Sequence, residues 1–303
     1  MNDISMEIFR ANQVNKTYKT SIFNEGITAL HEATLDLNRG ECCGLVGPNG
    51  AGKSTFIKII VGIERSNGGI INISKEIGAI GYVPEKPAFY ESMSAFNNLL
   101  YFAKLAGINN PSERVNKLLD DFGLSSRKED EVSGFSKGMR QRLAIARALI
   151  HRPGLLFLDE PFSGLDPSMT IDLKERLISM KRMGITMLIS SHNLAEVQAI
   201  CDNVAFMKDG NIVKKVSTKQ MNETAIVRFK IINKYHPSLQ ISKKIITQVI
   251  GSYYDFNIAR AEIPDLVSAI VMDGAKIEGV EFVENDIETL YRSIFKEEEH
   301  VSK

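Results

Sequence analysis

The sequence predicts an α/β fold built on a mainly parallel β-sheet that helices cover on both faces. Three observations favour this class. Short, wholly apolar stretches such as residues 155–158 fit strands that are buried on both faces. Stretches with helical periodicity, such as residues 137–150, alternate with them along the chain. Several apolar stretches end at glycine-rich or acidic residues, where the loops of a parallel sheet begin.

Turn residues and periodicity place the individual elements. Asp209 and Gly210 separate two apolar stretches and are typical of a two-residue hairpin turn. The expected strands are residues 6–14, 27–37, 41–46, 70–73, 77–83, 155–158, 185–190, 204–207, 212–216, 226–232 and 275–282. The expected helices are residues 54–61, the punctuated stretch 94–152, and residues 169–183, 193–200, 242–250 and 263–272.

The character of the chain changes after about residue 220, where glycine-rich loops and acidic strand ends no longer occur. The later segments still alternate between strand-like and helical patterns. We therefore expect two domains, a large α/β domain over residues 1–220 and a small α+β domain over residues 221–303.

The composition is that of an ordinary soluble protein, with 44% hydrophobic and 24% charged residues among 303. Lys and Arg together number 37, as do Asp and Glu, which argues against a broad basic surface for nucleic acid. No apolar run approaches the roughly 20 residues that a membrane-spanning helix needs. The first ten residues lack the apolar centre of a secretory signal. Cys42, Cys43 and Cys201 are expected to be buried core residues in a reducing compartment.

The strongest functional pattern is GPNGAGKST at residues 47–55, which matches G-x-x-x-x-G-K-[ST] between an apolar strand and a helix. Its glycines permit the tight turn that aims backbone N–H groups at phosphate oxygens. Lys53 is expected to reach the β- and γ-phosphates, Ser54 to bind Mg²⁺ and Thr55 to contact a phosphate. The predicted nucleotide-binding residues of this loop are Gly47, Pro48, Asn49, Gly50, Ala51, Gly52, Lys53, Ser54 and Thr55.

A second pattern, LLFLDEP at residues 155–161, brings two carboxylates to the carboxyl edge of the sheet, where ligands bind in such folds. Asp159 would hold Mg²⁺ through water, and Glu160 would polarise the attacking water as a general base. Alone, the pair also fits an ordinary strand end with a capping aspartate. The nearby phosphate loop favours catalysis.

A third pattern, GFSKGMRQRLAIARAL at residues 134–149, places Ser136 and Gly138 before a long helix. The N-terminus of that helix could present N–H groups to a phosphate. Because residues 47–55 already form one phosphate cradle, a second one suggests contact with the nucleotide of another molecule. The alternative is a surface helix capped by a serine.

Together these motifs resemble the ATP-binding cassette (ABC) family, the nucleotide-binding subunits of ABC transporters. The resemblance covers about residues 6–220, and five motifs occur in the family's order. It implies a P-loop NTPase fold with an N-terminal antiparallel β subdomain and a helical subdomain at about residues 90–152. It also implies ATP and Mg²⁺ as cofactors, and hydrolysis of ATP to ADP and phosphate coupled to transport.

Further residues take their expected roles from this resemblance. Tyr18 matches the aromatic residue that stacks on adenine, and His192 matches the switch histidine that contacts the γ-phosphate. With Lys53 and Glu160, His192 completes the expected catalytic set. Asp166 lies in a loop that links the two nucleotide sites of a dimer. The family signature, which acts across a head-to-tail dimer, matches Ser136, Lys137 and Gly138.

The sequence departs from the family pattern at two places. The signature reads Phe-Ser-Lys-Gly-Met at residues 135–139 instead of Leu-Ser-Gly-Gly-Gln. Glu85 replaces a glutamine that senses Mg²⁺ and the membrane partner; a carboxylate accepts bonds but cannot donate when ionised. The expected metal residues are thus Ser54, Asp159 and Glu85. Both variants, and the ending IETLY at residues 287–291, resemble the bacterial drug-, sodium- and bacitracin-resistance exporter branch.

We therefore expect an ATP-hydrolysing subunit of an ABC exporter. Two such subunits, identical or paralogous, would close around two ATP molecules and drive a separate membrane-spanning permease. The protein would lie in the cytoplasm, against the inner face of the membrane through that permease, and bind no nucleic acid.

Two other functions were weighed. A cassette ATPase that acts on ribosomes or DNA is disfavoured by the single cassette, the lack of coiled-coil insertions and the neutral net charge. A regulatory subunit that binds ATP without turnover is disfavoured by the intact Lys53, Asp159, Glu160 and His192.

One cluster of large apolar residues has two open interpretations. Phe89, Tyr90, Met93 and Phe96 follow Glu85 within a short stretch. They could fill the core of the helical subdomain, or form an exposed patch that receives a short cytoplasmic helix of the permease.

Overall fold

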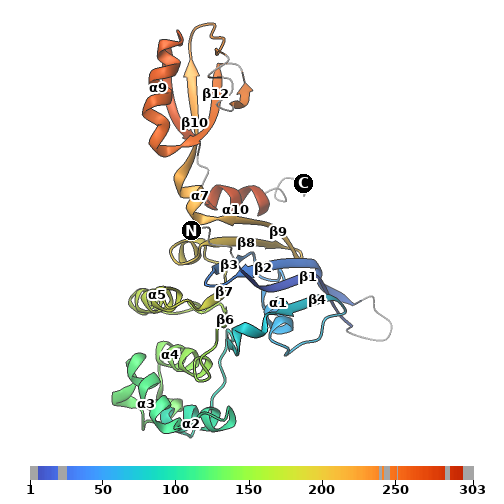
Figure 1. Cartoon of the computed structure of the whole chain (residues 1–303), viewed down its shortest axis with the longest axis vertical. Coiled ribbons are helices and arrows are strands. Elements are labelled where there is room, and N and C mark those ends of the chain that lie inside the picture. Colours follow the sequence, from blue (N-terminus) through green and yellow to red (C-terminus); the bar gives the residue numbers. More distant parts are fainter. Residues whose placement is uncertain are drawn as a thin grey trace, which may run out of the picture. The chain divides into compact units, whose positions relative to one another are not determined.

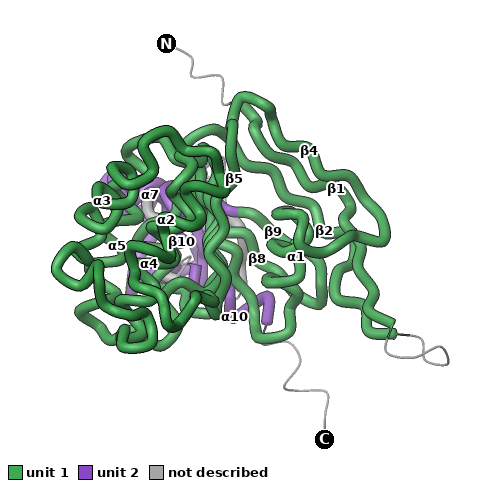
Figure 2. The backbone as a smooth tube through the Cα atoms, turned by 90° about the horizontal axis from the view of Figure 1, so that it is seen from below, with its two compact units in different colours: residues 1–215 green, residues 216–303 purple. Residues whose placement is uncertain are grey.

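The computed structural model describes residues 6–19, 26–238, 241, 246–250, 252–283 and 287–295. The chain divides into two units, residues 1–215 and residues 216–303 (Figure 2). Each unit buries its apolar strands in a hydrophobic core of its own.

A six-stranded sheet with the order β5-β6-β7-β3-β8-β9 lies at the centre of the first unit (Figure 1). The neighbouring strands from β5 to β8 run parallel. Every residue of β3, β6 and β7 is buried, which explains their unbroken apolar sequences. The strands are β3 (Cys42–Val46), β5 (Ile80–Val83), β6 (Leu155–Asp159), β7 (Thr186–Ser191), β8 (Asn203–Lys208) and β9 (Asn211–Ser217).

The predicted hairpin turn joins β8 to β9. Asp209 and Gly210 have φ values of 47° and 78°, and positive φ at both central residues is what the favoured two-residue turn requires. Gly210 also lies close against β2, since a Cβ there would stand 2.7 Å from the carbonyl oxygen of Ala29. This turn therefore holds β2 near the phosphate loop.

A three-stranded antiparallel sheet packs on one side of this centre, with the order β2-β1-β4. Its strands are β1 (Glu7–Tyr18), β2 (Ile27–Asn38) and β4 (Gly68–Ile73). Helix α1 (Lys53–Ile60) contributes Phe56 and Ile57 to the core that both sheets share. The phosphate loop is thus anchored between two sheets.

Helices α2 to α5 gather at the other side of the first unit (Figure 2). Ser94, Ser136 and Asp166 cap three of them, each accepting a hydrogen bond from the backbone N–H three residues later. Gly44 of β3 must be glycine, because a Cβ would lie 1.9 Å from a methyl group of Val197. The helices are α2 (Ala95–Leu105), α3 (Pro111–Asp121), α4 (Lys137–Ala148), α5 (Pro167–Arg182) and α6 (Leu194–Gln198).

The second unit is a four-stranded antiparallel sheet with the order β11-β12-β10-β13. Residues alternate along β10 between buried and partly exposed, and Phe229 meets Phe256 edge-on in the core. The elements are α7 (Thr218–Glu223), β10 (Thr224–Ile231), β11 (Ile246–Ile250), β12 (Tyr253–Ala259), α9 (Ile263–Met272), β13 (Ile277–Val283) and α10 (Ile287–Phe295).

The fold class is confirmed, with corrections to single elements. The helix expected at residues 242–250 is wrong where it can be checked, because residues 246–250 form strand β11; residues 242–245 lie outside the described residues. The strand expected at residues 77–83 is shorter, since Gly78 has a φ of 70° and separates a 3₁₀ turn from β5. The three cysteines are buried, as predicted.

Candidate nucleotide-binding site

The phosphate loop, residues 47–55, connects β3 to α1 at the carboxyl edge of the sheet. Glycine is required at Gly47, where a Cβ would lie 2.2 Å from the carbonyl oxygen of Met207. Gly52 has a φ of 103°, and a Cβ there would lie 2.6 Å from the carbonyl oxygen of Ala29 in β2. Because Gly52 caps α1 without a side chain, the first N–H groups of this helix have no side-chain acceptor. A phosphate group fits that position.

Lys53 is held at the centre of this loop. Its Nζ donates to the carbonyl oxygens of Gly47 at 2.7 Å and Pro48 at 3.2 Å, and lies 3.6 Å from Oε1 of Glu160. Only 6% of Lys53 is exposed. The loop therefore fixes one cation beside the catalytic carboxylate predicted from the sequence.

Glu160 follows β6 in a strained backbone conformation, with a φ of 48°. A non-glycine residue in such a conformation costs about 1–3 kcal/mol and persists where its surroundings enforce it. Here Ser190 does so, because its Oγ accepts a hydrogen bond from the Glu160 N–H at 2.9 Å. The same hydroxyl donates to Oδ1 of Asp159 at 2.6 Å. Ser190 thus orients both acidic residues.

His192 follows β7 and completes the arrangement. Its Nδ1 lies 2.8 Å from Oε2 of Glu160, so this carboxylate stands between His192 and Lys53. His192 keeps 56% of its side chain exposed, whereas Glu160 keeps 11%. The histidine can therefore reach a ligand from the solvent side.

These groups surround a cleft of about 410 Å³. Most of the predicted loop residues line it, together with Glu85, Glu160 and His192. Ala29 of β2, which was not predicted, also lines it, and so does Ser163 of the loop that leads to Asp166. The lining residues are Ala29, Asn49, Gly50, Ala51, Gly52, Lys53, Ser54, Thr55, Glu85, Glu160, Ser163 and His192.

The remaining predicted residues do not line this cleft. Tyr18 lies at the end of β1, with Nζ of Lys16 4.8 Å from its ring centre. Ser136, Lys137 and Gly138 begin α4, next to the loop that holds Asp166: the Lys137 ammonium covers Gly164, and Gly138 lies against Met169. Gly47 and Asp159 are buried and Pro48 is exposed, and none of the three lines the cleft.

Asp166 and the signature helix are ordered by local bonds. Oδ1 of Asp166 accepts from the Met169 N–H at 2.9 Å and from the Ser168 hydroxyl at 2.8 Å. The Met169 N–H bond is the larger of these two effects, and both hold the pKa of Asp166 below its usual range. Asp166 therefore stays ionised at the start of α5, where the helix dipole favours a negative charge.

The residues expected around Mg²⁺ fit a metal that keeps much of its own water. Nowhere in the described ranges do three or more His, Cys, Asp or Glu side chains gather as a metal-binding cluster. The Tyr82 hydroxyl is buried and has no hydrogen-bond partner among the described residues. Burial first, and then the nearby Asp159 and Glu85, raise the pKa of Tyr82 to about 12. Ser54 would offer a hydroxyl to Mg²⁺, and Glu85 and Asp159 would offer carboxylates to the metal-bound water that Mg²⁺ prefers to keep.

The parallel sheet and the glycine loop with its buried lysine define a P-loop nucleotide-binding domain. Residues 30–163 match a family model described as ABC transporter. The chain is 35% identical over 264 residues to the uncharacterized ABC transporter ATP-binding protein YdbJ of Bacillus subtilis, covering 80% of this chain and 82% of YdbJ. This chain belongs to the ATP-binding proteins of ABC transporters.

Two further similarities agree with this family. The lantibiotic transport ATP-binding protein SrtF of Streptococcus pyogenes is 38% identical over 192 residues, which cover 61% of this chain and 83% of SrtF. The structure of cbiO1 from Clostridium perfringens, part of the ABC transporter complex cbiONQ, superposes with a TM-score of 0.62 at 28% identity. It covers 72% of this chain and 91% of cbiO1. The predicted family, its P-loop fold and its transport role are thereby confirmed.

Proposed function

We propose that this chain hydrolyses Mg-ATP and that hydrolysis opens a dimer whose motion drives a membrane-spanning permease. The observation that carries this proposal is the convergence of Lys53, Glu160 and His192 on the phosphate loop. A subunit that only binds nucleotide needs the loop but has no need of a buried carboxylate fixed between two donors.

Each of these residues has a role in the reaction. The loop N–H groups and Lys53 bind the β- and γ-phosphates. Ser54, and through water Asp159 and Glu85, would hold Mg²⁺, which would supply positive charge against the phosphates. Glu160 accepts a proton from the attacking water, and Ser190 holds the backbone of Glu160 in place. When ATP enters, His192 and Lys53 exchange contacts with Glu160 for contacts with the γ-phosphate.

The signature residues serve the nucleotide of a second subunit. Ser136, Lys137 and Gly138 begin α4 outside the cleft that holds Lys53 in the same chain. Two chains placed head to tail would bring these residues onto the γ-phosphate bound by the partner. Asp166, in the adjoining loop, would link the two sites, and Tyr18 would stack on adenine.

Export is the proposed direction of transport. SrtF is named for lantibiotic transport, and the features shared with the drug-, sodium- and bacitracin-resistance branch favour export. None of the described helices is long and apolar enough to span a bilayer, so the proposal places the pore in another polypeptide. The chain would then lie on the cytoplasmic side of that permease.

Steady-state hydrolysis of Mg-ATP by the purified chain tests this proposal. Lys53→Ala removes the buried cation that stabilises charge on the γ-phosphate, so we expect turnover to fall by about 10²–10³-fold. Lys214→Ala, an exposed lysine of β9, is the matched control and should keep wild-type turnover. Absence of ATP turnover in the wild-type chain, or turnover by Lys53→Ala within about threefold of it, would contradict the proposal.

A further inference from the structure

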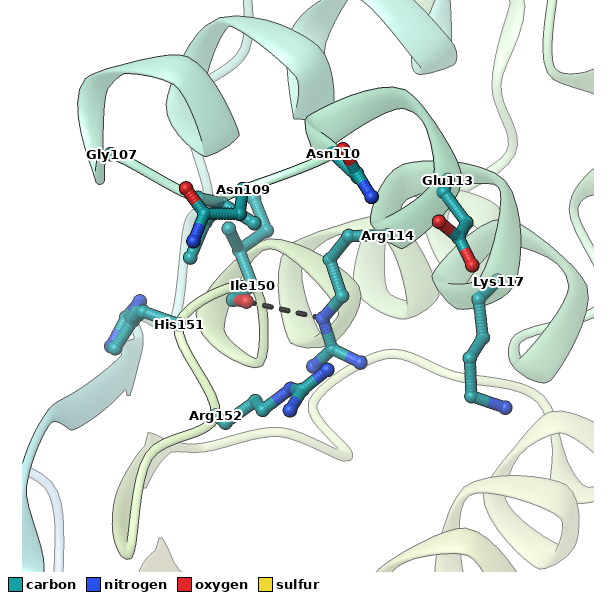
Figure 3. Close-up of a pocket in the computed structure, with 10 residues that line it drawn as sticks. Gly107, Asn109, Asn110, Glu113, Arg114, Lys117, Ile150, His151 and Arg152 are labelled. Carbon is teal, nitrogen blue, oxygen red and sulfur yellow. Dashed lines mark hydrogen bonds between the residues drawn. The ribbon is translucent and has the colours of Figure 1, made fainter.

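A second hollow lies in the helical part of the first unit and shares no residue with the cleft at the phosphate loop (Figure 3). It forms where the segment after α2 meets the end of α4 and has a volume of about 450 Å³. Asn109 and Asn110 line it together with three cationic side chains, those of Arg114, Lys117 and Arg152. ATP hydrolysis, as proposed above, uses none of these residues.

Arg114 is fixed in this hollow by the end of α4. Its Nε donates to the carbonyl oxygen of Ile150 at 3.1 Å, and its Nη2 donates to that of Leu149 at 2.5 Å. A guanidinium carries five N–H donors in a planar fork, so donors remain for a further acceptor. Arg114 is therefore already positioned for an anion.

Arg152 faces Arg114 across the hollow (Figure 3). Its φ of 53° and the bond from its N–H to the carbonyl oxygen of Leu149 set the direction of its side chain. In the part of the chain that the structure describes, no acceptor lies within hydrogen-bonding distance of its guanidinium. The nearby acids compensate this pair only in part. Asp121 pairs with Lys117 at 3.4 Å and offsets some of the charge of Arg114, and Glu113 forms no ion pair with either arginine among the described residues. Two such like charges repel each other.

A larger hollow of about 600 Å³ adjoins this one and shares Arg114, Lys117 and Arg152 with it. Its wall is mostly apolar and comes from α3, from α5 and from the segments that follow them. Met183 there is 70% exposed, although methionine is normally buried. The apolar side chains that line it include Leu118, Phe122, Met180, Met183 and Ile185.

We propose that the two hollows together bind an anionic amphiphile. Its phosphate or carboxylate group lies between Arg114 and Arg152, whose planar forks suit oxyanions. Its hydrocarbon chain covers Phe122, Met180 and Met183. A free oxyanion would leave the apolar hollow unused. Because α3 and α5 both line the binding site, the ligand bridges the helical part of the unit to the flank of the central sheet.

Titration calorimetry on the full chain, saturated with Mg-ADP so that the phosphate loop is occupied, tests the site. The probes are decyl phosphate below its micelle concentration and inorganic phosphate. Decyl phosphate should bind more tightly than inorganic phosphate by at least about tenfold, because apolar surface is buried. Arg152→Glu should lower the affinity for decyl phosphate by about tenfold or more. Met183→Ser should lower the affinity for decyl phosphate and leave the affinity for inorganic phosphate unchanged.

Arg65→Glu is the matched control, since it reverses the charge of an exposed arginine elsewhere in the same unit. It should leave the affinity for decyl phosphate as in the wild type, and ATP turnover should be unchanged in Arg152→Glu. The proposal is overturned if decyl phosphate does not bind, if it binds no tighter than inorganic phosphate, or if Arg152→Glu and Arg65→Glu lower its affinity equally.

Discussion

The backbone and side chain of Glu160 are held by three features that no other predicted site residue has together. Its backbone lies in the left-handed region, its N–H is bound by Ser190, and its carboxylate lies between Lys53 and His192. The strained conformation aims this carboxylate over the phosphate loop instead of along the strand. A general base has to be placed in this way before its basicity matters.

Glu160→Gln should therefore bind ATP but scarcely hydrolyse it. The amide preserves the shape of the side chain and removes the proton acceptor, which is typically worth about 10²–10⁴ in rate. The ATP-bound dimer should then accumulate, because its exit step is blocked. Turnover assays and size exclusion with light scattering, each with and without Mg-ATP, measure the two effects.

The control for this variant is Glu129→Gln, which changes an exposed glutamate in the same way. It should hydrolyse ATP at the wild-type rate and have the same oligomeric state as the wild type. Normal turnover by Glu160→Gln would remove Glu160 as the base. Loss of turnover without any dimer would contradict the proposed head-to-tail closure.

The sequence motifs predicted the side chains of the site but not how they are held. Lys53, Asp159, Glu160 and His192 stand in short local patterns, which are visible without a structure. Ser190 was not predicted as a site residue; it acts on Asp159 because β6 and β7 pair in parallel with these two residues in register. Ala29 reaches the cleft through the packing of β2 beside the loop. Non-local register of this kind has no sequence signal.

At the scale of single elements, the start of α2 is organised by one buried side chain. Asn98 is fully buried, and its amide donates to the carbonyl oxygens of Tyr90, Met93 and Ser94 at 3.0–3.2 Å. Its Oδ1 accepts from the Tyr90 N–H at 3.0 Å. This one residue closes the turn that leads from Glu85 into the helix.

Asn98→Leu should destabilise the first unit markedly. The substitution keeps the volume similar but leaves the Tyr90 N–H without its acceptor, which costs about 1–3 kcal/mol. The carbonyl oxygens of Tyr90 and Met93 lose the Asn98 amide and keep only the N–H groups of Met93 and Val132. In a domain of this size that cost corresponds to a fall in melting temperature of several degrees. Asn97→Leu, at the exposed neighbouring position, is the control. Thermal unfolding that shifts equally in both variants would show that helix propensity, and not the buried network, is responsible.

Elements whose structure is determined by their own sequence were predicted well. Elements whose structure depends on pairing with a distant strand were predicted poorly. The buried strands β3, β6 and β7 and the capped helices α4 and α5 lie where they were expected. Residues 246–250 were assigned to a helix, although they pair as a strand with β12, which was itself missed. Thr247, Val249 and Ile250 are β-branched and suit a strand. The helical pattern seen there was too short to outweigh that preference.

At the scale of the whole molecule, an exposed patch on the helical side of the first unit favours one of the two interpretations that the sequence left open. Tyr90 is 48% exposed, whereas Phe89, Met93 and Phe96 are only partly so. The sequence singled out Tyr90, but its partners come from α2: Tyr101 stacks edge-on at 5.3 Å, and Leu105 is 73% exposed. We call Tyr90, Tyr101 and Leu105 the aromatic patch.

The aromatic patch stands on a rigid base beside a hollow. The Arg147 guanidinium lies over the rings of Phe89 and Phe102 at 4.7 and 5.1 Å and donates to the carbonyl oxygen of Ala88 at 2.6 Å. A hollow of about 350 Å³ next to it is lined by Leu105, Arg147 and other residues of α2 and α4. Exposed apolar groups on such a base are typical of a docking site. Glu85 connects this region to the nucleotide cleft.

We therefore predict that the aromatic patch receives a helix of the permease. Tyr90→Ser combined with Leu105→Ser should preserve the melting temperature and the hydrolysis of ATP by the isolated chain, since both side chains are exposed. Co-purification with the co-expressed permease should be lost, because a few central apolar residues carry most of the energy of an interface.

The matched control is Ile63→Ser combined with Ile70→Ser, which removes comparable exposed apolar surface near the other sheet of the same unit. It should co-purify at the wild-type yield. If the patch variant unfolds at a lower temperature, its side chains belong to the core of the helical part and the interface lies elsewhere. If the patch variant folds and still co-purifies, the permease binds to another surface. Loss of co-purification in the patch variant alone would place the permease contact at the aromatic patch. The turn that Asn98 holds closed then lies between this contact and Glu85 of the nucleotide cleft.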